Sequence, residues 1–410
     1  MNILYLCADT GIPIRGDKGA AVHVRALTDA LVRAGHTVTI ATPRPGPADG
    51  PAPNATITEV GGDWGIRGLS EALVSAAARL LEQSPYDFIY ERYSLWSDAG
   101  ARLARESGLP LVLEVNAPLR LEAAQYRQLS DPETAAAIEA TQFQAAQAIS
   151  VVSEPLRQYV ISRGAAPERV HVLPNAVDPT HFHPAVRGGA IHHRYNLGDR
   201  IIVGFVGRPR PWHDLDTLLE AFAQLHATDS RYHLLLVGRM PDDLPGRLAA
   251  KGLSGAATLT GPVPHLDIPQ YIAAMDVAVS THAPEDPATP FYFSPLKLFE
   301  YLAVGVPTVA ADVGQPGEIM RKVAGGRWQA ASANYQLPMT LYPPGNVEAL
   351  AGRIRYLVEN PAEAREVAWR GATYVLQNHT WDGNAQAVIS WIPGRGEATG
   401  GGSIHDPDYC

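Results

Sequence analysis

A lysine lies in the first turn of a predicted helix within FYFSPLKLFEYLAVGVPTVAA, residues 291–311. Ser294 is a favourable N-cap and Pro295 suits the first helical position, which places Lys297 in the first turn. A cation there is unfavourable by about 0.3–1 kcal/mol, because a helix N-terminus already carries a partial positive charge. Glu300 faces the same side of the helix and could accept hydrogen bonds from a sugar diol. We expect an anion at this helix end; a surface ion pair between Lys297 and Glu300 is the alternative interpretation.

Charged and aromatic residues follow the strand candidate IIVGFVG in the segment RPRPWHDLD. Arg208 comes directly after the strand, where ligands of parallel sheets bind, and its planar cation suits phosphate oxygens. Arg210 is a weaker candidate, and His213 is interpreted as a polar loop residue and not as a catalyst. Asp214 and Asp216 form a D-x-D pair that could hold a metal with a diphosphate, but both can cap or line the next helix. We expect Arg208 to contact an anion and predict no metal site.

Two further groups of residues follow strand candidates in the first half. Gly16 and Gly19 lie between NILYLC and a predicted helix, where their backbone amides could approach a phosphate or a sugar closely. The segment lacks GxGxxG and the Lys-Ser/Thr of a P-loop, so a tight turn alone would also explain the glycines. Glu114 and Asn116 close PLVLEVN and point toward an expected cleft, with a structural turn as the alternative.

Strand-like and helical patterns alternate along the chain, which is typical of parallel α/β sheets. In the first half the strand candidates are NILYLC, HTVTIAT, DFIYERY, PLVLEV, AISVVS and RVHVLP, with helix candidates at 19–34, 71–82, 97–106 and 131–147. In the second half the strand candidates are IIVGFVG, YHLLLVG, ATLTG, VAVST and PTVAA, with helix candidates at 214–226, 268–275, 295–304 and 347–359. The sequence therefore predicts two facing Rossmann-like domains of the α/β class with a cleft between them.

The domain limits are predicted from the same alternation. Residues 1–176 would form the first domain, 177–198 a linker rich in Pro, Gly and His, and 199–378 the second domain. Residues 379–392 are expected to form a helix that crosses back to the first domain. The Gly-rich tail, 393–410, is expected to be disordered.

Composition narrows the class of protein. Of 410 residues, 46% are hydrophobic and 18% are charged, which suffices for large cores. The net charge of −9 argues against a nucleic-acid partner and favours at most peripheral contact with a membrane. The two cysteines, Cys7 and Cys410, predict neither a disulfide framework nor a zinc site. Because neither a signal peptide nor an apolar run of membrane-spanning length is apparent, we expect a cytoplasmic protein.

The order of these motifs resembles that of the retaining glycosyltransferases of family 4, which have the GT-B fold. The resemblance covers roughly residues 1–385 and rests on AVHVRALTDALVRAGHTVTIAT, VLPNAVDPTHF, FVGRPRPWHDLDTLLEAF, LTGPVP, IPQYIAAMDVAVS, SPLKLFEYLAVGVPTVA and HTWDGNAQ. It implies transfer of a sugar from a UDP- or GDP-linked donor to an acceptor hydroxyl or amine with retained anomeric configuration. The nucleotide-sugar is then a co-substrate, and no cofactor or metal is implied. Gly16 and Gly19 would shape the loop near the donor phosphates and the acceptor.

The resemblance also implies roles for residues of the second domain. Arg208 would bind the diphosphate, and Glu300 would hold the ribose hydroxyls. Main-chain groups from Gly261 to Val263 would meet the nucleobase. The helix end that faces the leaving diphosphate would comprise Ser294, Pro295, Leu296 and Lys297.

Three positions depart from the family pattern. The first Glu of the usual pair falls at Tyr292, which leaves the donor sugar open, with acidic residues at 285–286 as substitutes. The usual Lys after the Arg falls at His213, and Lys297 could supply the missing charge. The common cleft His falls at Asn116. The predicted catalytic residues are Arg208, Lys297 and Asn116.

The sequence leaves other function classes open. A non-catalytic nucleotide-sugar-binding protein, an inactive family member and a nucleotide-sugar 2-epimerase share this fold, while the missing GxGxxG disfavours a dehydrogenase. The acceptor can be a small molecule, a lipid-linked molecule or a glycan. No enzyme nucleophile is obvious, so the departing phosphate itself would take the acceptor proton.

Overall fold

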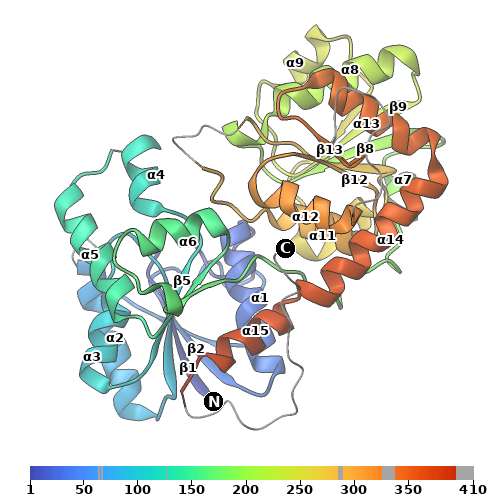
Figure 1. Cartoon of the computed structure of the whole chain (residues 1–410). Helices are drawn as coiled ribbons and strands as arrows, with labels where there is room; N and C mark the ends of the chain where they lie inside the picture. The colour runs from blue at the N-terminus through green and yellow to red at the C-terminus, as the bar shows by residue number, and fades with distance from the viewer. Residues whose placement is uncertain (63–64, 66–67, 127, 285–289, 326–337, 394–410) are drawn as a thin grey trace.

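Two α/β domains lie side by side, each built on a parallel sheet with helices packed around it (Figure 1). The computed structural model describes residues 1–410 except 63–64, 66–67, 127, 285–289, 326–337 and 394–410. The predicted fold class, two Rossmann-like parallel sheets, is confirmed.

The first sheet has the strand order β3-β2-β1-β4-β5-β6-β7 and is parallel throughout. The chain changes direction across the sheet between β1 and β4, and ligands of such sheets bind beyond the strand C-termini at that point. The strands are β1 Asn2–Cys7, β2 Thr37–Thr42, β3 Thr56–Glu59, β4 Phe88–Arg92, β5 Leu111–Val115, β6 Ala148–Val151 and β7 Val170–Val172. The helices are α1 Gly19–Arg33, α2 Gly68–Gln83, α3 Ala99–Ser107, α4 Leu119–Tyr126, α5 Pro132–Ala145 and α6 Glu154–Ile161.

The second sheet has the order β10-β9-β8-β11-β12-β13, again parallel, with its change of direction between β8 and β11. The strands are β8 Ile201–Val206, β9 Tyr232–Val237, β10 Ala257–Leu259, β11 Val277–Ser280, β12 Thr308–Ala311 and β13 Leu341–Tyr342. The helices are α7 Gly189–Arg194, α8 Leu215–Thr228, α9 Leu244–Ala250, α10 Ile268–Ile272, α11 Leu296–Val304, α12 Gly314–Ala324, α13 Val347–Glu359, α14 Pro361–Asn378 and α15 Trp381–Ser390.

Each sheet is covered on both faces, which is why its strands read as apolar runs and not as alternating patterns. In β1, Leu4 and Leu6 enter one core of the first domain, while Ile3 and Tyr5 enter the core on the opposite face. The same division holds in the second sheet. Rigid sheets of this kind hold the loops at their carboxyl edges in fixed positions.

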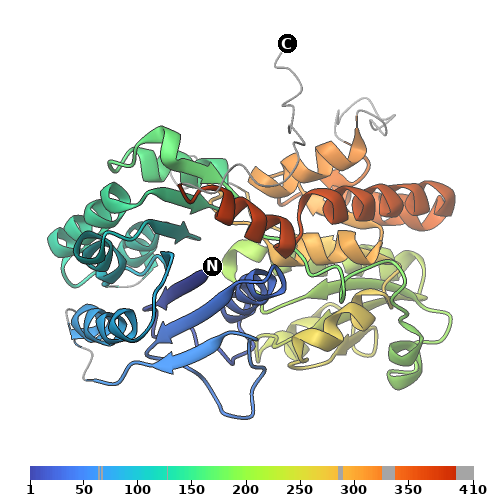
Figure 2. The ribbon, with the colours of Figure 1, turned by 90° about the horizontal axis from the view of Figure 1, so that it is seen from below.

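The C-terminal helices connect the two domains. The helix α14 runs along the second domain, and α15 returns to the first (Figure 2), where it packs against α1. Trp381 is 3% exposed and belongs to the same core as Ile3 and Tyr5. Asp382 accepts a hydrogen bond of 2.7 Å from the Arg33 guanidinium. This is the crossing helix expected at 379–392, while most of the predicted tail lies outside the described residues.

The start of α11 differs from the prediction. Pro295 is the N-cap of this helix, no described side chain caps it, and Ser294 lies outside it. The Ser294 hydroxyl instead accepts the backbone N–H of Asn175 at 2.9 Å. The expectation that Ser294 caps the helix was therefore wrong: the helix begins one residue later, and the Ser294 hydroxyl accepts from the interdomain connector, residues 173–188 between β7 and α7.

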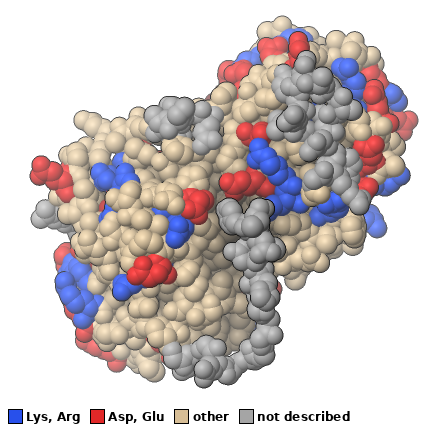
Figure 3. Space-filling model, viewed as in Figure 1, with Lys and Arg blue, Asp and Glu red and all other residues tan. Residues whose placement is uncertain are grey.

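The surface carries charges of both signs. Figure 3 shows basic and acidic side chains in small groups that alternate over the face of both domains seen in that view. None of the described helices has the length and apolar character needed to cross a bilayer.

Replacing Trp381 tests how much the returning helix stabilises the chain. We expect Trp381→Ala to lower the free energy of unfolding by about 3–5 kcal/mol, because a large buried ring leaves a cavity. Urea unfolding followed by circular dichroism measures this change. The matched control is Trp369→Ala on α14, where the ring is 67% exposed and a change within about 0.5 kcal/mol is expected. Equal losses in the two variants would contradict the packing described here.

Candidate active site

The ammonium group of Lys297 lies buried at the start of α11 without a hydrogen-bond partner among the described residues. It lies 3.9 Å from the centroid of the Phe205 ring at the end of β8. A Cβ atom placed on Gly207 would lie 3.7 Å from Nζ, so the ammonium is adjacent to the chain just before Arg208. Burial lowers the pKa of Lys297 to about 7, an effect that the Glu300 carboxylate partly offsets. A buried cation without an acceptor is costly, and an anion would remove that cost.

Two histidines share this region with Lys297 and carry no charge. Burial, followed by the charge of Lys297, lowers the pKa of His213 to about 2 and that of His282 to about 3. The His213 ring lies 6.0 Å from the Phe205 ring and 5.6 Å from the His282 ring. His213, expected to be a polar loop residue, is thus a partly buried residue that packs against aromatic rings. Lys297 and His213 flank the same aromatic ring, and only Lys297 can supply a cation there.

The two arginines after β8 are exposed. Arg208 and Pro209, together with residues 239–242 after β9, line a cavity of about 260 Å³ at the carboxyl edge of the second sheet. The backbone N–H of Arg210 donates to His213 Nδ1 at 3.0 Å, while its side chain faces solvent. A larger cavity of about 700 Å³ belongs to the first domain and is lined in part by Leu111, the first residue of β5. It therefore lies at the amino edge of the first sheet, away from the strand C-termini.

The D-x-D pair has structural contacts. Asp214 caps α8 by accepting the backbone N–H of Thr217 at 3.3 Å. Asp216 pairs with the guanidinium of Arg247. Within the described part of the chain, no group of three or more His, Cys, Asp and Glu residues could hold a metal ion.

Glu300 pairs with His265 and not with Lys297. His265 Nε2 lies 2.8 Å from Glu300 Oε1, and the carboxylate is largely buried. Gly261 and Val263 precede His265 in the same loop, and the Gly261 carbonyl accepts the N–H of Gly238 at 3.1 Å. The alternative interpretation of a surface ion pair between Lys297 and Glu300 is therefore wrong. His265 therefore places Glu300 next to the loop that contains residues 261–263.

The predicted glycine loop meets the start of α11. A Cβ atom on Gly19 would lie 3.6 Å from Leu296 Cδ1, so the N-termini of α1 and α11 approach each other across the domain junction. At Gly16 a Cβ atom would lie 2.7 Å from Pro13 Cγ, so only glycine fits there without a shift. The Gly16 carbonyl accepts a hydrogen bond of 2.7 Å from the Arg25 guanidinium. The loop is thus held in place beside the start of α11.

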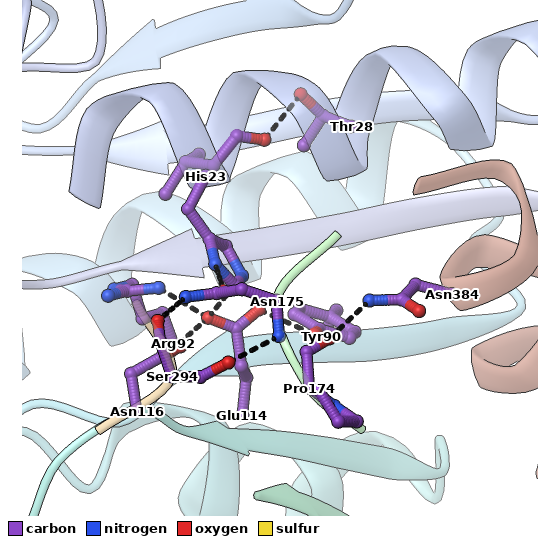
Figure 4. A network of polar contacts seen from close by, with 11 residues as sticks. His23, Thr28, Tyr90, Arg92, Glu114, Asn116, Pro174, Asn175, Ser294 and Asn384 are labelled. Carbon is purple, nitrogen blue, oxygen red and sulfur yellow. Dashed lines mark hydrogen bonds and ion pairs between the residues drawn. The ribbon is translucent and has the colours of Figure 1, made fainter. Parts of the chain in front are cut away.

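A buried carboxylate, Glu114, lies on the first-domain side of this junction (Figure 4). It accepts hydrogen bonds from Tyr90 at 2.6 Å and from the side chains of Arg92 and Asn116, while His23 Nε2 lies 3.1 Å from its Oε1. Burial would raise the pKa of Glu114, but His23 and Arg92 outweigh it and hold that pKa below its ordinary value. Glu114 is therefore an anchored anion, and Asn116 is held by it.

The network continues from His23 into the second domain. His23 Nδ1 lies 2.8 Å from Asn175 Oδ1. Asn175 Nδ2 donates to the Ser294 carbonyl at 2.5 Å, in addition to the bond between its backbone N–H and the Ser294 hydroxyl. Figure 4 shows these residues joined in one chain of contacts from α1 to the segment before α11.

Tyr292 faces the first domain. Its ring lies 6.0 Å from the Tyr159 ring, edge to face, and packs against the first-domain core. The Ser153 hydroxyl donates to the Tyr292 carbonyl at 2.7 Å. The acidic residues proposed as substitutes for the missing Glu, Glu285 and Asp286, lie outside the described residues.

The structure thus gathers most of the predicted residues at one junction. The group comprises Gly16, Gly19, Asn116, Arg208, His213, Ser294, Pro295, Leu296 and Lys297. Sequence reasoning missed His23, Asn175 and His265. Signals existed for two of them: His23 lies four residues before Leu27 and so falls on the apolar face of α1, and Asn175 belongs to the quoted motif VLPNAVDPTHF.

Residues 18–181 match the family model described as Glycosyltransferase Family 4, and residues 200–360 match the model described as Glycosyl transferases group 1. The chain is 31% identical over 299 residues to the D-inositol 3-phosphate glycosyltransferase of Actinosynnema mirum, an alignment that covers 66% of this chain and 68% of that protein. The chain belongs to glycosyltransferase family 4. This family 4 chain is accordingly a glycosyltransferase with the GT-B fold.

Other similarities of the family 4 chain agree with this assignment. It is 26% identical over 316 residues to the 2-deoxystreptamine glucosyltransferase of Streptomyces kanamyceticus, covering 73% of this chain and 76% of that one. Some relatives match over little more than half of their length, 56% for one that is 30% identical over 249 residues. The solved structure of Anabaena HepE in complex with UDP superimposes with a TM-score of 0.68 at 18% identity, covering 95% of this chain and 99% of that one, and so shows the fold alone.

The burial of Lys297 predicts a pH-dependent stability. Its folded-state pKa of about 7 lies below the value of about 10.4 for an exposed lysine. The free-energy cost of burying the charged ammonium is therefore fully present below pH 7, and it falls as the pH rises from 7 toward 10. We expect the free energy of unfolding of Lys297→Met to exceed that of the parent by about 1–3 kcal/mol near pH 6. Chemical unfolding at several pH values should show this difference shrinking above pH 7. A constant difference would contradict a buried, unpaired ammonium.

Proposed function

We propose that the chain is a retaining glycosyltransferase that moves a sugar from a nucleotide diphosphate sugar, UDP- or GDP-linked, to an acceptor hydroxyl or amine. The single observation that carries this proposal is the unpartnered, buried ammonium of Lys297 beside the uncapped N-terminus of α11. A cation and a free helix N-terminus at one point form a site for an anion of the size of a phosphate.

The surrounding residues fit the remaining parts of such a donor. Arg208 lines the adjoining cavity and can reach phosphate oxygens as a second cation. One Glu300 oxygen accepts from His265, which leaves the other for a ribose hydroxyl. The flexible stem of Lys297 lets its ammonium leave the Phe205 ring for an anion.

The proposed chemistry depends on stabilising the departing diphosphate. Charge develops on the bridging oxygen as the bond between the sugar and the phosphate breaks, and fixed donors in a closed cleft stabilise it without reorganisation. Lys297, Arg208 and the backbone N–H groups at the start of α11 would act in this way. The departing phosphate would accept the proton of the acceptor, which then attacks the same face of the sugar. The anchored Asn116 would hold a hydroxyl of the donor sugar at the opposite wall.

The relatives suggest which substrates to test. Anabaena HepE has been solved with UDP, with UDP and glucose, and with UDP-glucose. The names of the curated relatives give two cyclitol acceptors, D-inositol 3-phosphate and 2-deoxystreptamine. We therefore propose UDP-sugars and GDP-sugars as donors and cyclitols as the first acceptors to screen, before lipid-linked and glycan acceptors.

Nucleoside diphosphates should stabilise the chain against heat. A ligand at about 100 times its dissociation constant adds roughly 2.7 kcal/mol, so one of UDP, GDP, ADP and TDP should raise the melting temperature by several degrees. Differential scanning fluorimetry of the parent, Lys297→Met and Glu300→Gln measures this shift. We expect both variants to lose most of it, although Lys297→Met without ligand should melt later than the parent. Stabilisation by NAD alone would show that the donor site has been misassigned.

Transfer should keep the anomeric configuration of the donor. Incubation with the selected α-linked nucleotide-sugar and an accepting cyclitol should give an α-linked product, which the proton coupling of its anomeric carbon reveals by NMR. A β-linked product would exclude the retaining reaction. Donor binding without any product would favour the non-catalytic sugar-nucleotide-binding protein, and a change of configuration at C2 without an acceptor would favour the epimerase.

A further inference from the structure

We propose that Asn175 is a positioning residue for the leaving-group end of α11, and that His23 fixes the orientation of its side-chain amide. This inference rests on the proposed function of α11 as the diphosphate site. Asn175 belongs to the connector between the domains, so it acts on the donor end of the second domain from outside both sheets.

Asn175 holds Ser294 from two sides. Its backbone N–H donates to the Ser294 hydroxyl at 2.9 Å, and its side-chain Nδ2 donates to the Ser294 carbonyl at 2.5 Å. Ser294 is buried and directly precedes Pro295, the N-cap of α11. Two bonds to one residue fix both the place and the tilt of the peptide that leads into the helix.

The directions of the hydrogen bonds around Asn175 allow one arrangement only. The Ser294 carbonyl can only accept, so Asn175 must present its NH2 group there and its Oδ1 to His23. His23 Nδ1 must then donate to Asn175. Its Nε2 lies 3.1 Å from the Glu114 carboxylate, which also accepts, so both ring nitrogens of His23 face acceptors.

The far end of this chain of bonds is rigid. Glu114 is buried at the end of β5 and is held by Arg92, Tyr90 and Asn116. The His23 ring also packs edge to face against Trp381 of α15, with 4.7 Å between the ring centroids. Asn175 is therefore oriented by the first-domain sheet and the returning helix together.

The consequence concerns the uncapped N-terminus of α11. Because Asn175 occupies the Ser294 hydroxyl, that hydroxyl does not cap the helix, and the first backbone N–H groups stay available to an anion. The same contact keeps Leu296 against Gly19 and holds the first turn that carries Lys297. Asn175 thus positions groups that it does not itself touch.

Three variants separate positioning from simple stabilisation. Asn175→Ala removes the bond to the Ser294 carbonyl. Asn175→Asp places a carboxylate between the His23 ring and that carbonyl, so it keeps an acceptor for His23 Nδ1 and repels the Ser294 carbonyl. The matched control is Asn384→Ala, because Asn384 donates to the Pro174 carbonyl at 2.9 Å, one residue away in the same connector, without contacting Ser294.

We would titrate the full-length parent and each variant with UDP and with GDP by calorimetry. We expect Asn175→Ala to lower the affinity for the diphosphate by about tenfold relative to the parent, or about 1.4 kcal/mol. Asn175→Asp should lower this affinity further. The aspartate variant should nevertheless melt at or above the alanine variant, because its bond to His23 is charge-assisted. Asn384→Ala should lower the melting temperature and leave the affinity unchanged.

A second readout needs no ligand. Hydrogen exchange of the peptide that spans the start of α11 should accelerate in both Asn175 variants and stay at the parent rate in Asn384→Ala. The positioning role is wrong if affinity and exchange are unchanged in Asn175→Asp, or if the Asn384 control shows the same loss of affinity and the same acceleration of exchange. If the parent binds neither diphosphate, the proposed function fails, and the exchange measurement still decides whether Asn175 positions α11.

Discussion

An unneutralised positive charge at the junction of the two domains is the constraint on which the candidate site depends. The Lys297 ammonium is removed from water, and none of the described groups around it, an aromatic face and two neutral imidazoles among them, makes a hydrogen bond with it. The interaction with the Phe205 ring stabilises such a cation by roughly 0.5–2 kcal/mol, less than the cost of burying it. An uncapped helix end beside it adds to the same field. The arrangement becomes favourable once an anion arrives, which is why we assign it to binding and not to folding.

The fold was accessible from the sequence because both sheets are parallel and covered on both faces. Strands buried in this way form continuous apolar runs, and the helices between them keep a 3.6-residue period. The strands missed were β3 and β13, which have four and two residues and lie at the edges of their sheets. Five helices were also missed: α4, α6, α7, α9 and α12. The first four have no more than eight residues, and α12 has Gly314, Pro316 and Gly317 in its first turn. Short or irregular elements of this kind are held by tertiary contacts that leave no local pattern.

The site was predictable only in part, for a related reason. Arg208, Glu300 and Lys297 follow strands of one parallel sheet, so the rule that strand ends share an edge places them together. No such rule places the residues that hold the segment before α11. His23 and Asn175 are 152 positions apart, and Asn175 meets Ser294 119 positions later. Ser294 is a residue type that favours the N-cap position, but its hydroxyl accepts from Asn175, which is distant in the sequence.

The contacts between the domains converge on the segment that leads into α11. Tyr292 accepts from Ser153, Ser294 accepts twice from Asn175, and Gln315 at the start of α12 donates to the Val152 carbonyl at 2.6 Å. Apolar contacts accompany these bonds, because Tyr292 and Leu296 both pack against cores of the first domain. The start of α11 is therefore held by the first domain and by the connector together. Under the proposed function, these contacts would keep the backbone N–H groups of the first turn in the place where they meet the anion.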